Sequence, residues 1–300
     1  MIRNLDQLVD TVISNGKTYR IAVSWAQDQN TVGAIYRAVN EGFVSAIMIG
    51  NPTEIIRTCS NENIDSGKFE IVEAPDASTA SSMAVGMVRK GEADIVMKGL
   101  VGTDVFLKAV MDKDKGIMKQ GAVLSYVGAI QVTDYDKLLF ITDPAVIPYP
   151  DLAQKTAMLE YAISMARRLG INAPKIALMA ASEKSGKHFS SSGDYNMLRE
   201  KAANGDFGNC IIDGPLDLFL ACDRESVEIK GIKTPVNGDA DILLFPSLEA
   251  CNPFYKALML FAGGEIGGLI MGTEKPVIVM SRSESPKSKF YCIAMACTML

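Results

Sequence analysis

Short apolar runs alternate with longer amphipathic segments along most of the chain. The apolar runs predict buried strands, and the segments in which apolar residues recur at helical spacing predict helices. We expect strands at 20–26, 45–51, 69–75, 93–99, 137–143, 175–183, 240–247 and 275–281. We expect helices at 30–42, 78–91, 103–113 and 151–170. This alternation is typical of an α/β fold in which helices cover mainly parallel sheets.

The residues at the ends of these segments support the predicted boundaries. Gly42, Gly91 and Gly170 close predicted helices, as glycine does at many helix ends. Thr103 is expected to be the N-cap of the helix over 103–113. With 300 residues, the chain is long enough for about two domains.

The last predicted strand leads into the polar sequence SRSESPKSK, 281–289, which has two interpretations. In the first, Ser285 caps a helix whose first residue is Pro286. In the second, the segment is an anion site, because ligands of open α/β sheets bind beyond the carboxyl ends of strands. The guanidinium of Arg282 offers a planar fork of donors that fits phosphate or carboxylate.

A glycine-rich segment and a polar segment have an unusual composition but do not alter the predicted α/β fold. The glycine-rich segment 261–272 is interpreted as a tight turn with close backbone packing, since its glycines match no nucleotide-binding motif. The polar segment 186–196 is expected to be an exposed loop that contains the single histidine, His188. We expect His188 to be solvated rather than catalytic. One histidine also excludes a metal site built from several histidines.

One short sequence recurs in the two halves of the chain. GEADIVMKG at 91–99 and GDADILLFP at 238–246 share the pattern G-[ED]-A-D-I. The similarity is either chance between two buried strands or a sign of two related α/β halves. In the second case each half offers one lysine, Lys108 or Lys256, near the carboxyl end of a strand.

Composition narrows the class of protein. The net charge of −5 and pI of about 5.1 argue against a general nucleic-acid-binding protein. The six cysteines are scattered without a C-x-x-C pair, which is typical of reduced thiols. The N-terminus lacks the apolar core of a signal peptide, and no apolar run is long enough to span a bilayer. We therefore expect a soluble cytoplasmic protein without a membrane or nucleic-acid partner.

Several segments together resemble the phosphate acetyl/butyryltransferase family, and the similarity is greatest to its phosphate butyryltransferase branch. Each segment alone is a modest signal, but their order and spacing extend over nearly the whole chain. The segments are ADIVMKGLVGTDVFLKAV (93–110), ITDPAVIPYPDLAQK (141–155), PKIALMAASEK (174–184), DGPLDLFLACD (213–223), GDADILLFPSLEACNPFYKAL (238–258) and KPVIVMSRSESPKSK (275–289).

The resemblance implies an activity and an architecture. The reaction is reversible transfer of an acyl group from acyl-CoA to inorganic phosphate, which gives acyl phosphate and free CoA, with a short acyl group such as butyryl. The fold is two doubly wound α/β domains with mainly parallel sheets, similar to isocitrate and isopropylmalate dehydrogenases. We expect one domain at 1–141 plus 283–300, a second at 142–282, and an active site in the cleft between them. The family also implies a homodimer, no metal, and no bound cofactor, since coenzyme A is a substrate.

The resemblance also transfers roles to single residues of this chain. Ser281 and Arg282 fall on the family's catalytic serine-arginine pair, in which the arginine holds phosphate or acyl phosphate and the serine assists at the thiol or carbonyl. The other positions are expected to bind substrate: Lys98, Gly99, Thr103, Lys108, Asp143, Asn252, Lys256 and Glu284.

The sequence departs from the family pattern at several of these places. Ile147 stands where the family has asparagine, and Cys251 where it has glycine. The family's Asp-Asn-Ala is Phe219-Leu220-Ala221. Ser288 replaces an aspartate that is proposed as general base in the acetyl branch, and Glu284 is the nearby carboxylate that could substitute for it. A covalent role for Cys251 would require a lowered thiol pKa.

Two alternatives to the transferase remain at this point. The departures are compatible with a non-catalytic relative that binds CoA or acyl phosphate. A metal- and NAD-dependent decarboxylating dehydrogenase is similar in fold, but the sequence has neither an aspartate cluster suited to a divalent metal nor a dinucleotide fingerprint.

Overall fold

The computed structural model of the chain describes residues 1–184, 186 and 192–300. The prediction for His188 lies outside the described residues, as do residues 187–191 of the segment expected to be an exposed loop. Ser192 already begins helix α7 (Ser192–Ala203), so the expected loop is wrong from that residue onward. None of the helices among the described residues has the length and apolar character needed to cross a bilayer.

The chain divides into two compact units whose boundaries differ from the expected ones. One unit contains 5–124 and 265–300, and the other contains 1–4 and 125–264. Two pairs of strands account for the difference. Strand β5 (Ser125–Gln131) pairs with β6 (Leu139–Thr142), so the second unit starts before both. Strand β10 (Glu265–Met271) pairs with β11 (Val277–Ile278), and both belong with the first strands of the chain.

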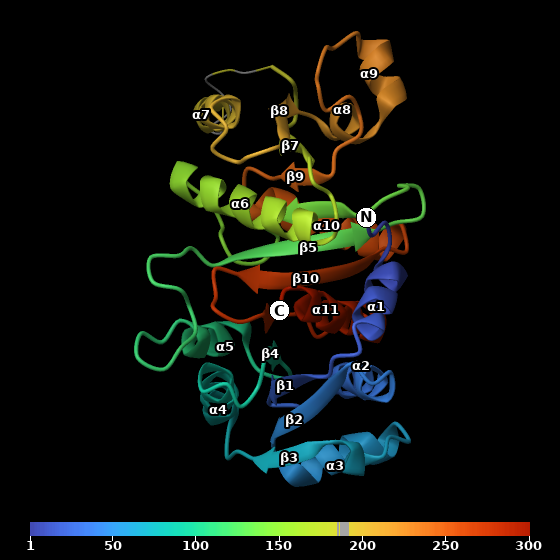
Figure 1. Ribbon diagram of the computed structural model, residues 1–300, viewed down its shortest axis with the longest axis vertical. Helices are drawn as coiled ribbons and strands as arrows, with labels where there is room; N and C mark the ends of the chain where they lie inside the picture. Colours follow the sequence, from blue (N-terminus) through green and yellow to red (C-terminus); the bar gives the residue numbers. More distant parts are fainter. Residues whose placement is uncertain (185, 187–191) are drawn as a thin grey trace. The chain divides into compact units, whose positions relative to one another are not determined.

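The unit formed by 5–124 and 265–300 contains a mainly parallel sheet in the order β3-β2-β1-β4-β11-β10 (Figure 1). Only β10 runs antiparallel to its neighbour β11. The remaining strands are β1 (Tyr19–Ser24), β2 (Val44–Gly50), β3 (Glu70–Glu73) and β4 (Ile95–Lys98). The helices are α1 (Leu5–Ser14), α2 (Gln29–Asn40), α3 (Pro52–Asn61), the 3-10 turn η1 (Ser66–Lys68), α4 (Ala77–Arg89), α5 (Thr103–Val110) and α11 (Pro286–Thr298).

Helix α11 forms the centre of this unit, and its residues from Ser288 to Cys297 are all buried. It packs on β10, whose glycines allow the close approach. A Cβ on Gly267 would lie only 3.3 Å from both the Tyr291 carbonyl oxygen and a Leu5 methyl group. The close packing expected for the glycine-rich segment is therefore present, but the expected turn is confined to its first residues, and the rest of the segment is strand β10. The chain reverses just before the strand, at Gly263, which has a φ of +59°.

In the unit formed by 1–4 and 125–264, neighbouring strands follow the order β5-β6-β9-β7-β8. Strands β6, β9, β7 and β8 are parallel, and β5 is antiparallel to β6. The strands not yet given are β7 (Lys175–Met179), β8 (Ile211–Leu216) and β9 (Ile242–Leu244). Besides α7, the helices are α6 (Leu152–Arg168), α8 (Leu218–Cys222), α9 (Arg224–Lys230) and α10 (Leu248–Phe261).

The repeated sequence has the same local structure in both units. In the first, the Arg20 backbone N–H donates to the Asp94 carboxylate at 2.9 Å, and the Asp94 N–H donates back to the Arg20 carbonyl at 2.7 Å. In the second, Lys175 and Asp241 make the same two bonds at 2.8 and 2.7 Å. Each aspartate thus ties the start of one parallel strand to its neighbour, β4 to β1 and β9 to β7. This equivalence favours two related halves over chance similarity.

The predicted N-cap is confirmed for helix α11 and is wrong for helix α5. Ser285 is the N-cap of α11, with Pro286 as the first helical residue, as predicted. Its side chain accepts from the Ser288 N–H at 2.9 Å. The prediction that Thr103 is the N-cap of its helix is wrong, because Thr103 is the first residue of α5. Gly102 takes that position with extended backbone angles, and no side chain caps the helix there.

Candidate active site

The carboxyl ends of three neighbouring strands form one edge of the first unit's sheet. Ser24 at the end of β1 pairs in register with Lys98 at the end of β4, and Met97 pairs with Ile278 at the end of β11. The loops 25–28, 99–102 and 279–285 therefore start from the same edge. This register brings Lys98, Gly99 and the Ser281–Arg282 pair to one place, as the sequence predicted for an anion site.

Gly99 holds two of these loops together. Its N–H donates to the Ser24 carbonyl at 2.8 Å, and the next N–H, of Leu100, donates to the Trp25 carbonyl at 2.9 Å. A Cβ on Gly99 would lie 2.6 Å from the Trp25 carbonyl oxygen, which no side chain tolerates. Glycine is thus required here by the close approach of the two backbones.

Lys98 is buried at this edge, with 3% of its surface exposed. Its ammonium group donates to the carbonyl oxygens of Gly99 at 3.2 Å and Val101 at 3.1 Å. Burial lowers the pKa of Lys98 to about 8. This value includes the effects of nearby charges: those of Lys289 and Arg282 act in the same direction as burial, and that of Asp28 opposes it.

The segment that carries the Ser281–Arg282 pair is held by contacts to its backbone. The Asn30 amide donates to the carbonyl oxygens of Arg282 and Glu284, each at 3.3 Å. The hydroxyl groups of Ser281 and Ser283 lie 3.0 Å apart. The guanidinium of Arg282 is exposed and makes no hydrogen bond or ion pair with the described residues. It is therefore available to an anionic ligand.

Lys289 is a residue of this site that the sequence analysis missed. It lies in the first turns of α11, only 2% of its surface is exposed, and its ammonium group donates to the Ser281 carbonyl at 3.0 Å. Burial lowers its pKa, against the attraction of Asp28 and Glu284. The available signal was a lysine directly before the apolar run 290–297, which indicates a helix buried on all sides.

Ser288, which replaces the family's aspartate, has a structural role. Its hydroxyl group accepts from the Ile266 N–H at 3.0 Å and donates to the Glu265 carboxylate. The Ser285 hydroxyl group donates to the same carboxylate oxygen at 2.7 Å. The carboxylate next to position 288 is thus Glu265, at the start of β10, and not the expected substitute Glu284.

The two residues predicted on α5 lie at opposite ends of that helix. Thr103 is exposed next to the loop 99–102, so the structure brings it to the edge that carries Lys98. Lys108 is exposed in the last turn, away from the end of β4, and makes no ion pair with the described residues.

In the second unit, Asp143 follows β6 and is buried, with 1% of its surface exposed. Its carboxylate accepts four backbone N–H bonds, at 2.7 to 3.3 Å, from Ala145, Val146, Ile147 and Tyr126. Burial raises the pKa of Asp143, although these hydrogen bonds oppose the shift. The Ser125 side chain also hydrogen-bonds this carboxylate. Three of its four backbone bonds go to residues 145–147, so Asp143 organises the turn 143–147 from within.

The turn organised by Asp143 also contacts α10. The Asn252 amide donates to the Pro144 carbonyl at 2.8 Å, which brings the predicted residues Asp143 and Asn252 together. Lys256 is exposed one helical turn later. Cys251 is fully buried, and burial together with the charge of Asp143 raises its thiol pKa well above the usual value. This environment argues against Cys251 as a covalent nucleophile.

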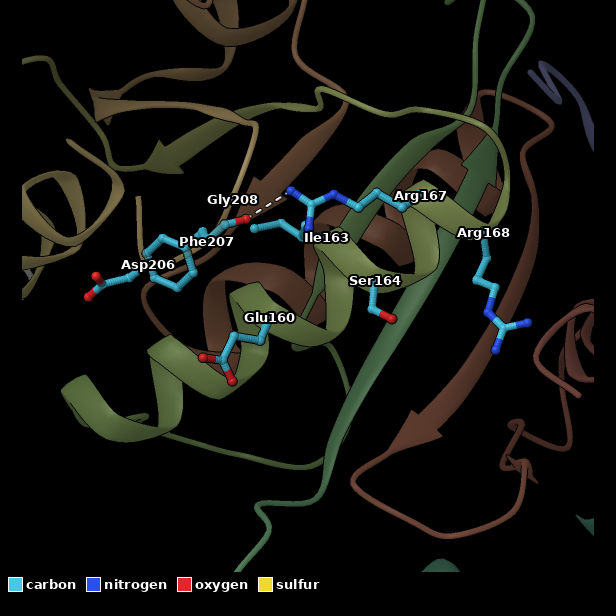
Figure 2. Close-up of a pocket in the computed structure, with 8 residues that line it drawn as sticks. All are labelled: Glu160, Ile163, Ser164, Arg167, Arg168, Asp206, Phe207 and Gly208. Atoms are coloured by element: carbon cyan, nitrogen blue, oxygen red, sulfur yellow. Dashed lines mark hydrogen bonds between the residues drawn. The ribbon is translucent and has the colours of Figure 1, made fainter. Parts of the chain in front are cut away.

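Two cavities in the described structure contain none of the predicted residues. One, of about 590 Å³, lies between the end of α6 and the loop 206–208 (Figure 2). The guanidinium of Arg167, which lines this cavity, donates hydrogen bonds to the carbonyl oxygens of Phe207 at 2.8 Å and Asn209 at 3.0 Å. The other, of about 630 Å³, lies between the end of α4 and the segment 111–121. No group of three or more histidine, cysteine, aspartate or glutamate side chains among the described residues could hold a metal ion.

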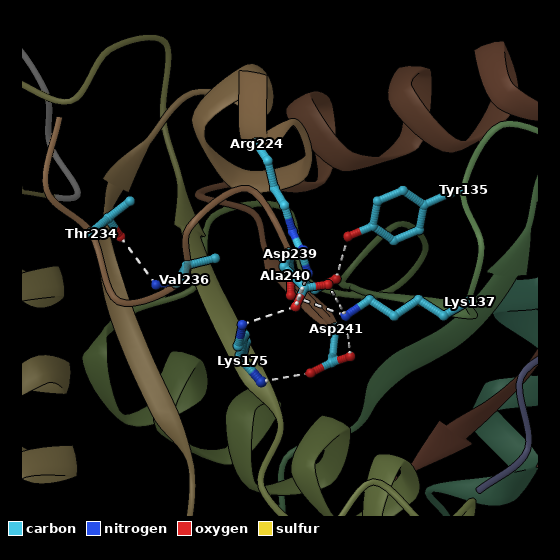
Figure 3. A network of polar contacts seen from close by, with 9 residues as sticks. All are labelled: Tyr135, Lys137, Lys175, Arg224, Thr234, Val236, Asp239, Ala240 and Asp241. Carbon is cyan, nitrogen blue, oxygen red and sulfur yellow. Dashed lines mark hydrogen bonds and ion pairs between the residues drawn. The ribbon is translucent and has the colours of Figure 1, made fainter. Parts of the chain in front are cut away.

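A dense ionic network lies at the amino ends of β6, β7 and β9 (Figure 3). The Asp239 carboxylate pairs with Lys137 and Lys175 at 2.9 Å and with Arg224 at 3.1 Å. Burial alone would raise the pKa of Asp239, but hydrogen bonds from the two lysines outweigh it and hold the pKa far below the usual value. This network joins the amino ends of the strands. The turn 143–147 follows the carboxyl end of β6, so the network lies at the opposite edge of the sheet.

Comparisons with known proteins identify the family of this chain. The family model described as "Phosphate acetyl/butaryl transferase" matches residues 76–297. The phosphate butyryltransferase of Clostridium acetobutylicum is 35% identical over 296 residues, which are 99% of this chain and 98% of that protein. The phosphate acetyltransferase of Thermotoga maritima is 32% identical over 97% of this chain and 98% of that protein. The crystal structure of a branched-chain phosphotransacylase from Enterococcus faecalis matches with a TM-score of 0.81 and 29% identity, and covers 93% of this chain and 98% of that one. The chain therefore belongs to the phosphate acetyl/butyryltransferase family.

Proposed function

We propose that the protein is a phosphate acyltransferase that moves a short acyl group reversibly between coenzyme A and inorganic phosphate. The observation that carries the proposal is the cluster of cations at one sheet edge. Lys98 and Lys289 are buried there, and the guanidinium of Arg282 has no partner within the described part of the chain. A reaction between two anionic substrates needs such a cluster to bring phosphate to the thioester. Relatives named as phosphate butyryltransferase and phosphate acetyltransferase support the same activity.

In the proposed mechanism, a phosphate oxygen attacks the thioester carbonyl carbon, and the tetrahedral intermediate expels the CoA thiolate. The C–S bond breaks and the new C–O bond gives acyl phosphate. Hydrogen phosphate loses its proton to solvent as this bond forms, and the thiolate takes one proton from solvent, so protons balance. Holding the reactants in place can lower the barrier by roughly 7–11 kcal/mol in favourable cases. Arg282 and Lys98 hold the phosphate, and the Ser281 hydroxyl group donates to the carbonyl oxygen or to the departing sulfur.

The remaining predicted residues are proposed to position CoA and the acyl group. Gly99 and Thr103 shape the first loop, and Glu284 orients the segment after β11. Lys108 and Lys256 are exposed cations without ion pairs among the described residues, and we assign them to the phosphates of CoA. Asp143 holds the turn 143–147, which Asn252 contacts, and we assign to this turn a role in positioning the substrate. No bound cofactor takes part in the proposed reaction.

We also propose a cytoplasmic homodimer with a preference for the butyryl group. Helix α10 supports the dimer, because Cys251 is its only buried residue and Leu260 and Phe261 are 75% and 82% exposed. The butyryl preference rests on the identity to the phosphate butyryltransferases. The cytoplasm is where acyl-CoA and phosphate would both be available. Light scattering of the purified protein would give twice the chain mass of 32.3 kDa if the dimer is correct.

Release of CoA tests the function directly. The protein is incubated with acetyl-, propionyl-, butyryl- or isobutyryl-CoA, with and without phosphate, and free thiol is followed with a thiol-reactive dye. We expect phosphate-dependent release that is fastest with butyryl-CoA. Protein that binds CoA but releases no thiol from any of the four would instead be the non-catalytic relative. The departures at Ile147, Phe219 and Ser288 would then explain the loss of activity.

The affinity for phosphate is expected to fall as the pH rises above about 8. Lys98 has a pKa of about 8, so its ammonium group, which faces Lys289, Asp28 and Arg282, loses its proton in this range. Inorganic phosphate is by then already the dianion, so its own charge no longer changes. The KM for phosphate should rise by up to about tenfold per pH unit above this pKa. The acyl-CoA direction is used, because acyl-CoA has no free thiol to titrate. A KM for phosphate that stays constant across this range would remove Lys98 from the phosphate site.

A further inference from the structure

Two buried ammonium groups lie together at the candidate site, and neither is neutralised. Lys98 lies on β4 and Lys289 on α11, and each has 3% or less of its surface exposed. No carboxylate lies within 4.0 Å of either nitrogen among the described residues. Asp28 attracts both groups, but its side chain also caps α2 through the Thr31 N–H at 2.9 Å. A buried charge without a partner costs several kcal/mol, so this pair favours an anionic ligand.

The two groups also have hydrogen-bond donors to spare. An ammonium group carries three donors. Lys98 uses two of them on the carbonyl oxygens of Gly99 and Val101, and Lys289 uses one on the carbonyl oxygen of Ser281. One donor of Lys98 and two of Lys289 remain without an acceptor among the described residues. Ser281 is itself exposed, so a single short segment separates Lys289 from solvent.

We propose that Lys289 is a phosphate-binding residue and that the phosphoryl group lies between the ammonium groups of Lys98 and Lys289, with Arg282 closing the site from the solvent side. The inference rests on the proposed function and deepens it by naming the residue that completes the phosphate subsite. A small dianion offers several acceptor oxygens and two charges, which matches three cations and the spare donors. It also separates Lys98 from Lys289, whose charges repel each other in its absence.

CoA carries phosphate groups as well, and the experiment distinguishes the two sources. Lys289→Met removes the buried charge and retains most of the side-chain volume. Its matched control is Lys287→Met, an exposed lysine two residues earlier in the same helix. We expect Lys289→Met to raise the KM for inorganic phosphate about 10- to 100-fold, since a charge-assisted hydrogen bond is lost. The KM for butyryl-CoA should stay within about twofold of the wild-type value, as should both constants of the control.

A thermal measurement separates binding from a merely structural role. Inorganic phosphate at constant ionic strength should raise the Tm of the wild type and of Lys287→Met, but not that of Lys289→Met. In phosphate-free buffer, Lys289→Met should be as stable as the wild type, because the lost bond to Ser281 is offset by removal of an uncompensated charge. A role limited to holding Ser281 would lower the Tm of the variant in both buffers and leave the effect of phosphate unchanged.

Each outcome bears on the inference or on the function separately. An unchanged KM for phosphate together with an unchanged phosphate effect on Tm in Lys289→Met would overturn the inference, as would an effect on the KM for butyryl-CoA alone. If the wild type shows no turnover but its stabilisation by phosphate is lost in the variant, the phosphate site stands and the transferase activity fails. Should Lys289→Met not fold, Lys98→Met is the second variant, with the same phosphate-specific effects expected.

Discussion

Replacement of Arg282 by alanine is expected to lower kcat/KM for acyl transfer about 100- to 1,000-fold and to leave the fold intact. The guanidinium is the one exposed cation of the proposed phosphate subsite, and a lost donor to the reacting anion typically has an effect of this size. The side chain makes no hydrogen bond or ion pair with the described residues, so its removal should leave the free energy of unfolding unchanged. Steady-state kinetics and thermal unfolding of the same preparation check both statements.

Two variants control for the loss of a positive charge. Arg57→Ala removes an exposed arginine of the same unit, whose ion pair with Glu54 lies on α3, and should leave turnover unchanged. Arg282→Lys keeps the charge without the planar fork and should recover only part of the activity. Near-normal turnover of Arg282→Ala would eliminate Arg282 as the phosphate anchor.

Asp143→Ala is expected to lower the free energy of unfolding by about 3–5 kcal/mol. The substitution removes a buried carboxylate that accepts the backbone N–H groups of Ala145, Val146, Ile147 and Tyr126. The N–H groups of Tyr126 and Ile147 would then be buried without acceptors, which has a larger effect than the loss of a surface hydrogen bond. Chemical denaturation followed by circular dichroism measures the change.

The control for this prediction is Asp136→Ala, an exposed aspartate of the same unit that should change stability by less than about 0.5 kcal/mol. The experiment also separates two roles of Asp143. Normal stability of Asp143→Ala combined with a raised KM for acyl-CoA would make Asp143 a direct substrate-binding residue and contradict its role as organiser of the turn.

The elements that the sequence predicts well are strands with unbroken apolar runs and helices whose apolar residues recur at helical spacing. The predicted strand at 45–51 is β2 (Val44–Gly50), and the predicted helix at 151–170 is α6 (Leu152–Arg168). Three strands were missed because they contain residues that usually interrupt strands. Strand β5 contains Gly128, β8 contains Gly214 and Pro215, and β10 contains Gly267 and Gly268. Only the packing of α11 on β10 explains why glycines belong in that strand.

The site was predictable where it follows directly from strand ends. Lys98 and Arg282 each come just after or at the end of an apolar run, and parallel strands place such ends at one edge. The burial of Lys289 depends instead on a helix that neighbouring elements enclose on all sides. The fourfold backbone contact of Asp143 depends on the path of the chain after β6. The apolar run 290–297 was the one available signal for the burial of Lys289, whereas the contacts of Asp143 are not visible in residue types or spacing.

The identity of the second product tests the central claim most directly. Phosphorus NMR of a mixture of the protein, butyryl-CoA and inorganic phosphate measures acyl phosphate, while the thiol dye measures free CoA in the same sample. The account predicts one acyl phosphate formed for each CoA released, and no release without phosphate. Free CoA that appears without acyl phosphate would mean transfer of the acyl group to water and would contradict the proposed phosphate acyltransferase.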